Sequence, residues 1–279
     1  MSSTGEDAVK LNEASRRDAD GEREVPTVAA DEGAVPTVAV DGLTKRYGDT
    51  AALADVDLTA ADGEFVSVVG PSGCGKSTLL CVLSGLEERF EGHAAVDGVD
   101  VRNGGSDAVG MVFQEPRLLP WADVRGNVAV GLPEGIDPAE ADAADWIDEL
   151  VETVGLDGFE DHRPDGLSGG MAQRVSLARG LAYEPEVLLL DEPFSALDRL
   201  TKYERQDNLL DVWDEQGTTV LLVTHDVEEA AYLSDRVVVL GGQPGTIVET
   251  VDVDVNRPRD RTDEELVAVR AAITDALGV

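Results

Sequence analysis

Residues 70–78 read GPSGCGKST. This stretch matches the pattern G-x-x-x-x-G-K-[ST], a glycine-rich turn whose backbone N–H groups surround phosphate. An apolar run, EFVSVV, precedes it at 64–69, and LLCVLSGL follows at 79–86. Strand, glycine turn and helix start therefore stand in the order that the pattern needs. The sequence predicts a nucleotide phosphate site, and a chance glycine-rich turn is the weaker interpretation.

The loop residues divide the binding of a nucleotide among them. Successive backbone N–H groups wrap the β-phosphate, and the helix N-terminus adds its positive end. Lys76 reaches the β- and γ-phosphates, and the Ser77 hydroxyl ligates magnesium. Glycines allow backbone conformations that other residues rarely adopt, and they let the backbone approach the phosphate more closely than a Cβ would permit. We assign nucleotide binding to Gly70, Pro71, Ser72, Gly73, Cys74, Gly75, Lys76, Ser77 and Thr78.

A second apolar run, VLLL at 187–190, ends in an acidic pair, Asp191 and Glu192. Continuous hydrophobicity is expected of a strand that is buried on both faces of a parallel sheet. Alone, the pair is compatible with an ordinary acidic turn. In a chain with a phosphate loop, we expect Asp191 to support magnesium through water. Glu192 would then orient and polarise an attacking water.

Between these motifs, residues 167–174 read LSGGMAQR. Here the chain resembles the ATP-binding subunits of ABC transporters, whose signature is LSGGQ-like. The resemblance covers roughly residues 38–260 and rests on five motifs in the family order. These are the phosphate loop, VFQEP with Gln114, the signature, the acidic pair with SALD at 195–198, and LLVTHD with His225. Tyr47, in KRYG, matches the aromatic residue that stacks on adenine.

The resemblance implies an ATPase that uses ATP and Mg²⁺. It gives catalytic roles to Lys76, Gln114, Glu192 and His225, nucleotide contacts to Tyr47 and Asp198, and magnesium contacts to Ser77, Gln114 and Asp191. It also implies a head-to-tail dimer, in which Ser168, Gly169 and Gly170 of one chain close on the ATP of the other. The implied fold is α/β: a P-loop NTPase core with a mixed or parallel sheet, an antiparallel β subdomain and a helical signature subdomain.

A finer resemblance lies in EPRLLPW at 115–121 and in the tail at 244–260. Both look like the nitrate/sulfonate/taurine-type branch of ABC importers. This branch implies a transmembrane permease subunit that contacts the EPRLLPW region, and indirectly an extracellular solute-binding protein. The chain would then lie peripherally on the cytoplasmic face of the membrane. From composition alone, Leu118, Leu119 and Trp121 are equally well explained as ordinary core.

Two other functions compete with an importer motor for a small anionic or polar solute. One is a soluble ABC ATPase of DNA repair or cluster assembly. Two features argue against it. No long coiled-coil insertion interrupts the motifs, and the EPRLLPW segment resembles importers. The other is a nucleotide-binding scaffold without hydrolysis, which Glu192 and His225 argue against. The sequence does not identify the cargo.

Charge is the outstanding feature of the composition, because 57 acidic and 22 basic residues give a net charge of −35. The first forty residues contain nine acids and four bases, or −5, so −30 remains on the other 239. An acidic surface with few lysines resembles proteins from salt-loving organisms, although an ordinary cytoplasm remains an alternative. Nucleic acid is a poor partner for such a surface.

The chain is expected to have three parts. Residues 1–36 are polar and charged and are predicted to be disordered. Residues 37–260 form the ATP-binding domain, with its helical subdomain at about 115–180, and 261–279 form a C-terminal helix. We expect strands near 37–40, 54–59, 65–69, 94–97, 108–113, 187–191, 219–223 and 236–240. No apolar stretch approaches the roughly 18 residues of a membrane span.

The chain has two cysteines, Cys74 and Cys81. Seven residues of helix separate them by about 10 Å, which is too far for a disulfide and suits a reducing compartment. Lys76 and a helix N-terminus lie near Cys74, and both favour a thiolate. One hypothesis is an exposed, activated Cys74 beside a buried Cys81. The alternative is that Cys74 is a small residue in a tolerant position.

Overall fold

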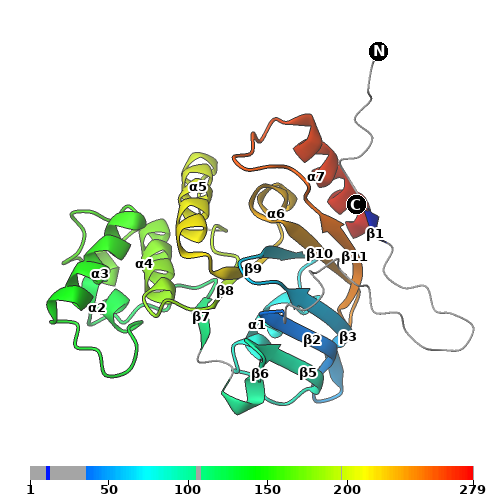
Figure 1. Ribbon diagram of the computed structural model, residues 1–279, viewed down its shortest axis with the longest axis horizontal. Helices are drawn as coiled ribbons and strands as arrows, with labels where there is room; N and C mark the ends of the chain where they lie inside the picture. The colour runs from blue at the N-terminus through cyan, green and yellow to red at the C-terminus, as the bar shows by residue number, and fades with distance from the viewer. Residues whose placement is uncertain (1–10, 13–35, 105–107, 196, 279) are drawn as a thin grey trace, which may run out of the picture. The chain divides into compact units, whose positions relative to one another are not determined.

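The computed structural model of the protein describes residues 11–12, 36–104, 108–195 and 197–278 (Figure 1). The chain forms two compact units. The first unit combines Met1–Ser106 with Leu221–Val279, and the second is Asp107–Val220. In the described part of the chain, every helix is too short or too polar to cross a membrane.

An antiparallel sheet in the first unit confirms the predicted antiparallel β subdomain. Its strand order is β3-β2-β5-β6. Buried and exposed positions alternate along much of β3, because successive side chains point to opposite faces of a sheet. The strands are β2 (Val38–Tyr47), β3 (Thr50–Ala60), β5 (Glu91–Val96) and β6 (Val99–Asp100).

The other strands of the first unit follow the order β1-β11-β10-β4-β9. β4 is parallel to β10 and buried along its whole length, whereas β10 is antiparallel to β11, so the sheet is mixed. The strands are β1 (Leu11–Asn12), β4 (Phe65–Val69), β9 (Thr219–Thr224), β10 (Arg236–Gly241) and β11 (Thr246–Asp252). The helices of this unit are α1 (Lys76–Leu83), α6 (Val227–Leu233) and α7 (Glu264–Leu277).

β1 differs from the disorder that we predicted for residues 1–36. It pairs with β11, whose other neighbour is β10. Without β1, β11 would be an edge strand with unpaired backbone groups, and such an edge accepts a further strand whatever its side chains are. The rest of the predicted extension lies outside the described residues.

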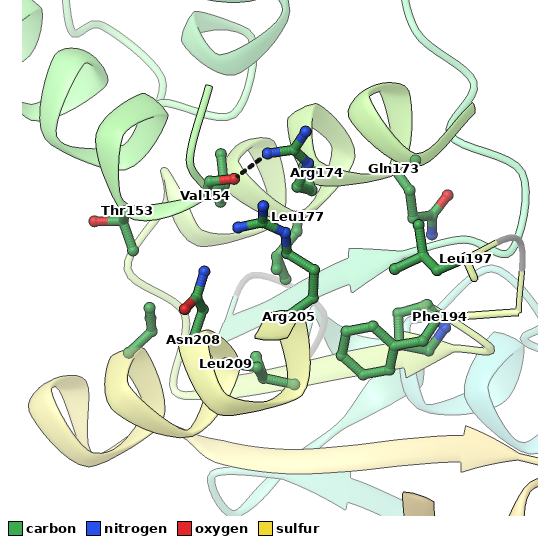
Figure 2. Close-up of a pocket in the computed structure, with 13 residues that line it drawn as sticks. Thr153, Val154, Gln173, Arg174, Leu177, Phe194, Leu197, Arg205, Asn208 and Leu209 are labelled. Carbon is green, nitrogen blue, oxygen red and sulfur yellow. Dashed lines mark hydrogen bonds between the residues drawn. The ribbon is translucent and has the colours of Figure 1, made fainter. Parts of the chain in front are cut away.

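In the second unit, β7 (Val109–Val112) and β8 (Val187–Asp191) are parallel neighbours. A Cβ on Gly110 would overlap the carbonyl of Gly180, so glycine lets helix α4 approach β7 closely. The side chains of Ile147 and Leu150 are buried on the inner face of α3. The helices of this unit are α2 (Val124–Ala129), α3 (Ala141–Thr153), α4 (Gly169–Leu181) and α5 (Arg199–Gln216). Residues of α3, α4 and α5 line a cavity (Figure 2).

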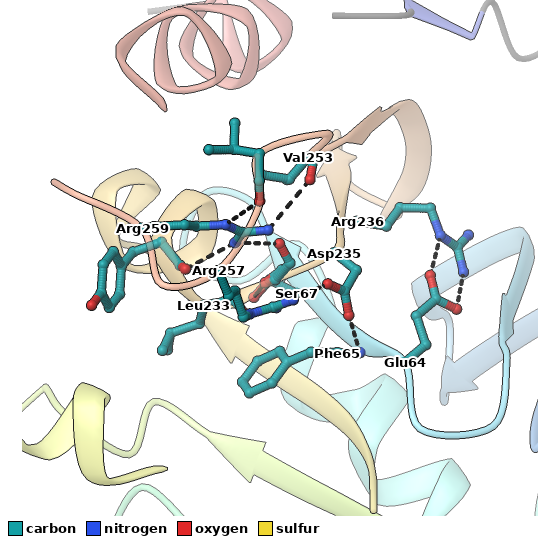
Figure 3. A network of polar contacts seen from close by, with 12 residues as sticks. Glu64, Phe65, Ser67, Leu233, Asp235, Arg236, Val253, Arg257 and Arg259 are labelled. Atoms are coloured by element: carbon teal, nitrogen blue, oxygen red, sulfur yellow. Dashed lines mark hydrogen bonds and ion pairs between the residues drawn. The ribbon is translucent and has the colours of Figure 1, made fainter. Parts of the chain in front are cut away.

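Two arginines, Arg257 and Arg259, hold the segment that leads to α7 (Figure 3). Arg259 is 8% exposed and donates hydrogen bonds to carbonyls at the end of α6 and in its own segment: Ala231, Tyr232, Ser234, Val253 and Val255. Burial lowers the pKa of Arg259 to about 10, so its guanidinium is charged at neutral pH. Arg257 pairs with Asp235, which also accepts from the backbone N–H of Phe65 (3.0 Å). These contacts attach the C-terminal segment to both α6 and β4.

Candidate functional site

The phosphate loop connects β4 to α1 in the first unit. Gly73 and Gly75 have φ angles of 80° and 101°, which few other residues adopt, and Gly75 is the N-cap of α1. Lys76 folds back over the loop, and its Nζ donates to the carbonyls of Gly70 (2.7 Å) and Pro71 (3.1 Å). Ser77 is exposed at the helix start. This glycine-built cradle, with an ammonium and a hydroxyl at one helix N-terminus, fits a nucleotide phosphate with magnesium.

The turn between β10 and β11 supports the loop. A Cβ on Gly245 would overlap the carbonyl of Cys74, and Gln243 Nε2 donates to the carbonyl of Gly73 (3.3 Å). Gly245 also exchanges backbone hydrogen bonds with Ala52 and Ala54 of β3. Sequence reasoning missed this contact. The signal in the sequence is Gly245 of the PGT stretch, which lies in the tail at 244–260. The resemblance connects that tail only with the importer branch.

The hypothesis of an exposed, activated Cys74 is wrong. Its side chain is 1% exposed, and burial raises the pKa of the thiol more strongly than the nearby Lys76 lowers it. Cys81, expected to be buried, is partly exposed. Nearness to Lys76 in sequence did not reveal that Cys74 points beneath the loop, against Gly70.

Tyr47 ends β2 with 48% of its surface exposed. Partial burial and the Glu87 carboxylate raise the pKa of its phenol, and a hydrogen bond with Thr78 opposes this shift. Lys45 lies over the ring at 4.8 Å from its centroid and forms an ion pair with Glu87 at 2.5 Å. Tyr47 therefore lies beside the end of the phosphate loop, and Lys45 packs over its ring. We did not predict Lys45, because a lysine in an exposed-looking KRYG turn carries no signal of burial.

Gln114 and Glu192 meet in the second unit. Gln114 follows β7, Glu192 follows β8, and the side-chain amide of Gln114 donates to Glu192 Oε2 at 3.2 Å. Glu192 has a φ of 46°, a left-handed conformation that non-glycine residues rarely adopt. Asp191, the last residue of β8, is 8% exposed. The parallel pairing of β7 and β8 thus brings two of the predicted catalytic residues together.

The signature forms the start of α4. Ser168 is its N-cap, and the Ser168 hydroxyl accepts from the backbone N–H of Met171 (3.3 Å). Gln173, one turn on, donates to the carbonyl of Phe113 (3.0 Å), which precedes Gln114. The signature helix is therefore connected to the segment that carries Gln114. Asp198 caps α5, and its hydrogen bonds with Thr201 lower the pKa of its carboxyl.

His225 belongs to the first unit. It follows β9, a neighbour of β4, and its side chain is exposed just before α6. The predicted site residues therefore divide between the units. Tyr47, the loop and His225 belong to the first unit; Gln114, Ser168, Gly169, Gly170, Asp191, Glu192 and Asp198 belong to the second. No three acidic, His or Cys side chains cluster as a metal site among the described residues.

Comparison with known proteins identifies the family. The ABC transporter family model matches residues 53–195. An aliphatic sulfonates import ATP-binding protein of Xanthomonas axonopodis pv. citri is 52% identical over 84% of this chain and 92% of that protein. The chain belongs to the ABC transporter family. A second protein with the same description, from Pseudomonas savastanoi pv. phaseolicola, is 49% identical over 83% of this chain and 92% of its own length.

A solved ABC cassette agrees in structure. It is a dimeric ATP-binding cassette bound to ADP and phosphate, with a TM-score of 0.70 and 31% identity over 77% of this chain and 98% of that chain. These findings confirm the predicted fold class, the use of ATP and Mg²⁺, and ATP hydrolysis. They also confirm an importer motor over a soluble ATPase without transport. An import subunit of this family associates with a membrane permease and pairs with a second cassette.

Proposed function

We propose that this chain drives the import of an aliphatic sulfonate. The observation that carries the proposal is the 52% identity, over most of both chains, to a sulfonate import ATP-binding protein. The sulfonate would be delivered by an extracellular solute-binding protein and pass through a permease. The chain would lie on the cytoplasmic face of the membrane, as a peripheral subunit.

Glu192 is proposed as the carboxylate that orients and polarises the attacking water. Its contact with Gln114 supports this role, because the amide holds the carboxylate in place. Asp191 and Gln114 would support magnesium, together with Ser77. Lys76 would hold the β- and γ-phosphates, where its positively charged ammonium stabilises the negative charge on the leaving group.

The signature and His225 are proposed to act on the γ-phosphate in a head-to-tail dimer. Ser168 stands at the N-terminus of a thirteen-residue helix, where free backbone N–H groups and the helix dipole favour an anion. Hydrogen-bond donors of this kind stabilise negative charge as it spreads in the transition state. Tyr47, with its exposed ring, would stack on adenine, and Asp198 would contact the nucleotide across the dimer.

The EPRLLPW segment is proposed to contact the permease. Trp121 is 71% exposed, which favours this role over ordinary core. The segment is also well held, because the buried side chain of Asn127 accepts from the N–H of Leu119 (2.7 Å) and donates to the carbonyls of Ala122 (3.1 Å) and Asp123 (2.9 Å). A fixed loop that presents a large aromatic residue is typical of an interface hot spot.

The proposal is tested with the chain, its permease and its binding protein in lipid vesicles. We expect ATP turnover to rise when an alkanesulfonate and the binding protein are added together. Trp121→Ala should weaken association with the permease, whereas Tyr183→Ala, which removes another exposed aromatic residue, should not. If nitrate stimulates turnover and alkanesulfonates do not, the proposed cargo is wrong.

A further inference from the structure

Gln114 lies in a short segment, residues 113–117, that belongs to no helix or strand. The side chains of Gln114 and Glu115 are exposed. Arg117 has a φ of 45°, which non-glycine residues rarely adopt, and its guanidinium lies over the ring of Phe113 at 4.8 Å from the centroid. Because the segment lacks the backbone hydrogen bonds of a regular element, other groups must fix the position of Gln114.

Two side chains of the signature helix α4 hold this segment at its two ends. On the N-terminal side, Nε2 of Gln173 donates to the carbonyl of Phe113 (3.0 Å). On the C-terminal side, Arg179 donates from Nη2 to the carbonyl of Pro116 (2.8 Å) and from Nη1 to that of Arg117 (3.2 Å). The carbonyls on both sides of Gln114 are therefore bonded to the same helix.

Arg179 directs its charge at neutral acceptors, although the chain has 57 acidic residues. Its third acceptor is the buried hydroxyl of Ser176 (3.3 Å), so within the described residues its hydrogen bonds all go to uncharged oxygens. Burial lowers the pKa of Arg179, which shows that its surroundings disfavour the charge. Hydrogen bonds from a charged donor are stronger than neutral ones. The arrangement therefore favours firm attachment of two backbone carbonyls over an ion pair.

We propose that Gln173 and Arg179 are positioning residues for Gln114. By holding residues 113–117 at both ends, they keep the Gln114 amide within hydrogen-bond distance of Glu192 Oε2 (3.2 Å). The same helix begins at the signature, so the signature and Gln114 share one support. This inference rests on the catalytic roles proposed above for Gln114 and Glu192.

Release of either end of the segment should slow hydrolysis without weakening ATP binding. The proposed contacts of the phosphate loop and Tyr47 with ATP come from the first unit, and a substitution on α4 leaves those side chains in place. A misplacement of about 1 Å in a catalytic group can slow a reaction about 100-fold. We therefore expect a lower kcat and a nearly unchanged affinity for ATP.

Phosphate release and ATP binding by the purified full chain test the proposal. Arg179→Met and Gln173→Met keep an unbranched stem and remove the donors. We expect kcat to fall at least about tenfold in each, whereas the Kd of a fluorescent ATP analogue changes less than about twofold. Arg179→Lys keeps the charge but lacks the planar fork that bonds two carbonyls, so its kcat should lie between those of Arg179→Met and the natural chain.

Arg174→Met is the matched control, because Arg174 is another arginine of α4 whose pKa burial lowers. It donates to the carbonyl of Val154 (2.9 Å) and to that of Gly155. Figure 2 shows Arg174 reaching toward Val154, whereas Gln173 extends from α4 in a different direction. Arg174→Met should lower the melting temperature as Arg179→Met does, yet leave kcat of the folded protein within about twofold of the natural value.

A double-mutant cycle shows whether Arg179 acts through Gln114. Gln114→Ala removes the amide, so Arg179 then has no catalytic group to position. In that background, Arg179→Met should change kcat by less than about twofold, whereas independent effects would multiply. This result separates positioning of Gln114 from a general structural role, which would slow turnover in either background.

Two results would overturn the positioning role and leave that of Gln114 intact. One is natural kcat in folded Arg179→Met and Gln173→Met while Gln114→Ala is slow, and the other is a full effect of Arg179→Met in the Gln114→Ala background. Natural turnover in Gln114→Ala would refute the proposed role of Gln114 and the positioning inference with it. If Arg179→Met does not fold, Arg179→Lys and Gln173→Met decide between the same outcomes.

Discussion

At the scale of single residues, backbone conformation and neighbouring side chains determine what each group can do. Glu192 adopts a left-handed conformation, and Gln114 holds one of its carboxylate oxygens at 3.2 Å. Such strain is uncommon and concentrates at functional positions. In the phosphate loop, Lys76 is 6% exposed and bonded to two carbonyls of its own loop. The side chains of Glu192 and Lys76 therefore have little freedom of orientation. Catalysis of phosphoryl transfer by positioning and electrostatics requires this.

Replacing Lys76 by alanine should weaken ATP binding. The substitution removes the charge on the β- and γ-phosphates, and hydrogen bonds to charged groups are worth about 1.5–3 kcal/mol, or at least tenfold in affinity. Equilibrium binding of a fluorescent ATP analogue measures the effect. Lys202→Ala, which removes a lysine of α5, is the control. Unchanged affinity in Lys76→Ala would refute the phosphate-loop assignment.

The two cysteines should react in the order opposite to our sequence-based hypothesis. Burial raises the pKa of Cys74, so less thiolate is present at a given pH, and the thiol is also covered. Cys81 is partly exposed. Brief treatment with a maleimide, followed by peptide mapping, should label Cys81 first. Cys81→Ser should leave only slow labelling, whereas preferential modification of Cys74 would contradict its burial.

At the scale of elements, helix ends and short connections position the site. Ser168 caps α4, and Asp198 caps α5. Helix α6 begins two residues after His225, and Arg259 bonds to carbonyls at its C-terminal end. Each device satisfies backbone groups that a helix end leaves unpaired.

Replacing Arg259 by methionine should destabilise the protein. The change leaves several buried carbonyls without a donor, and we expect a loss of about 3 kcal/mol in the free energy of unfolding. Chemical denaturation at neutral pH measures it. Arg46→Met removes one exposed hydrogen bond, to the carbonyl of Asp49 (2.8 Å), and should change stability by about 0.5 kcal/mol or less. Equal stabilities of the two variants would contradict the structural role of Arg259.

The elements that the sequence predicted best have uninterrupted apolar runs between turn residues. Strands β4 and β8 lie within one residue of the expected positions, because burial on both faces leaves a continuous signal. Strand β11, TIVETVD, mixes polar and apolar residues, and β6 has two residues, so neither has a continuous apolar run. The Gln114–Glu192 contact required the pairing of β7, which ends at Val112, with β8, which begins 75 positions later at Val187. The packing of Gly245 against the carbonyl of Cys74 likewise joins residues that are remote in sequence.

At the scale of the whole molecule, charge dominates. A net charge of −35 makes the folded protein repel itself, and dissolved salt screens that repulsion. Lowering ionic strength from 1 M to 0.1 M lengthens the screening distance from about 3 to about 10 Å. The resemblance to proteins from salt-loving organisms therefore predicts that added salt stabilises this protein.

We expect the melting temperature to rise as potassium chloride increases from 0.1 to about 1 M, because screening weakens repulsion between acidic side chains. Differential scanning calorimetry provides the measurement, and sucrose of equal osmolality separates screening from excluded-solute effects. A melting temperature that does not depend on potassium chloride would contradict the halophilic prediction.

The most direct test of the central claim is phosphate release by the purified chain and by Glu192→Gln. The amide keeps the shape of the carboxylate but loses the charge that polarises water. We predict magnesium-dependent release by the natural chain, and in Glu192→Gln unchanged ATP affinity with turnover at least about 100-fold slower. The variant should accumulate as an ATP-bound dimer in size-exclusion chromatography. Release by Glu192→Gln at the rate of the natural chain would contradict the account of how this protein hydrolyses ATP.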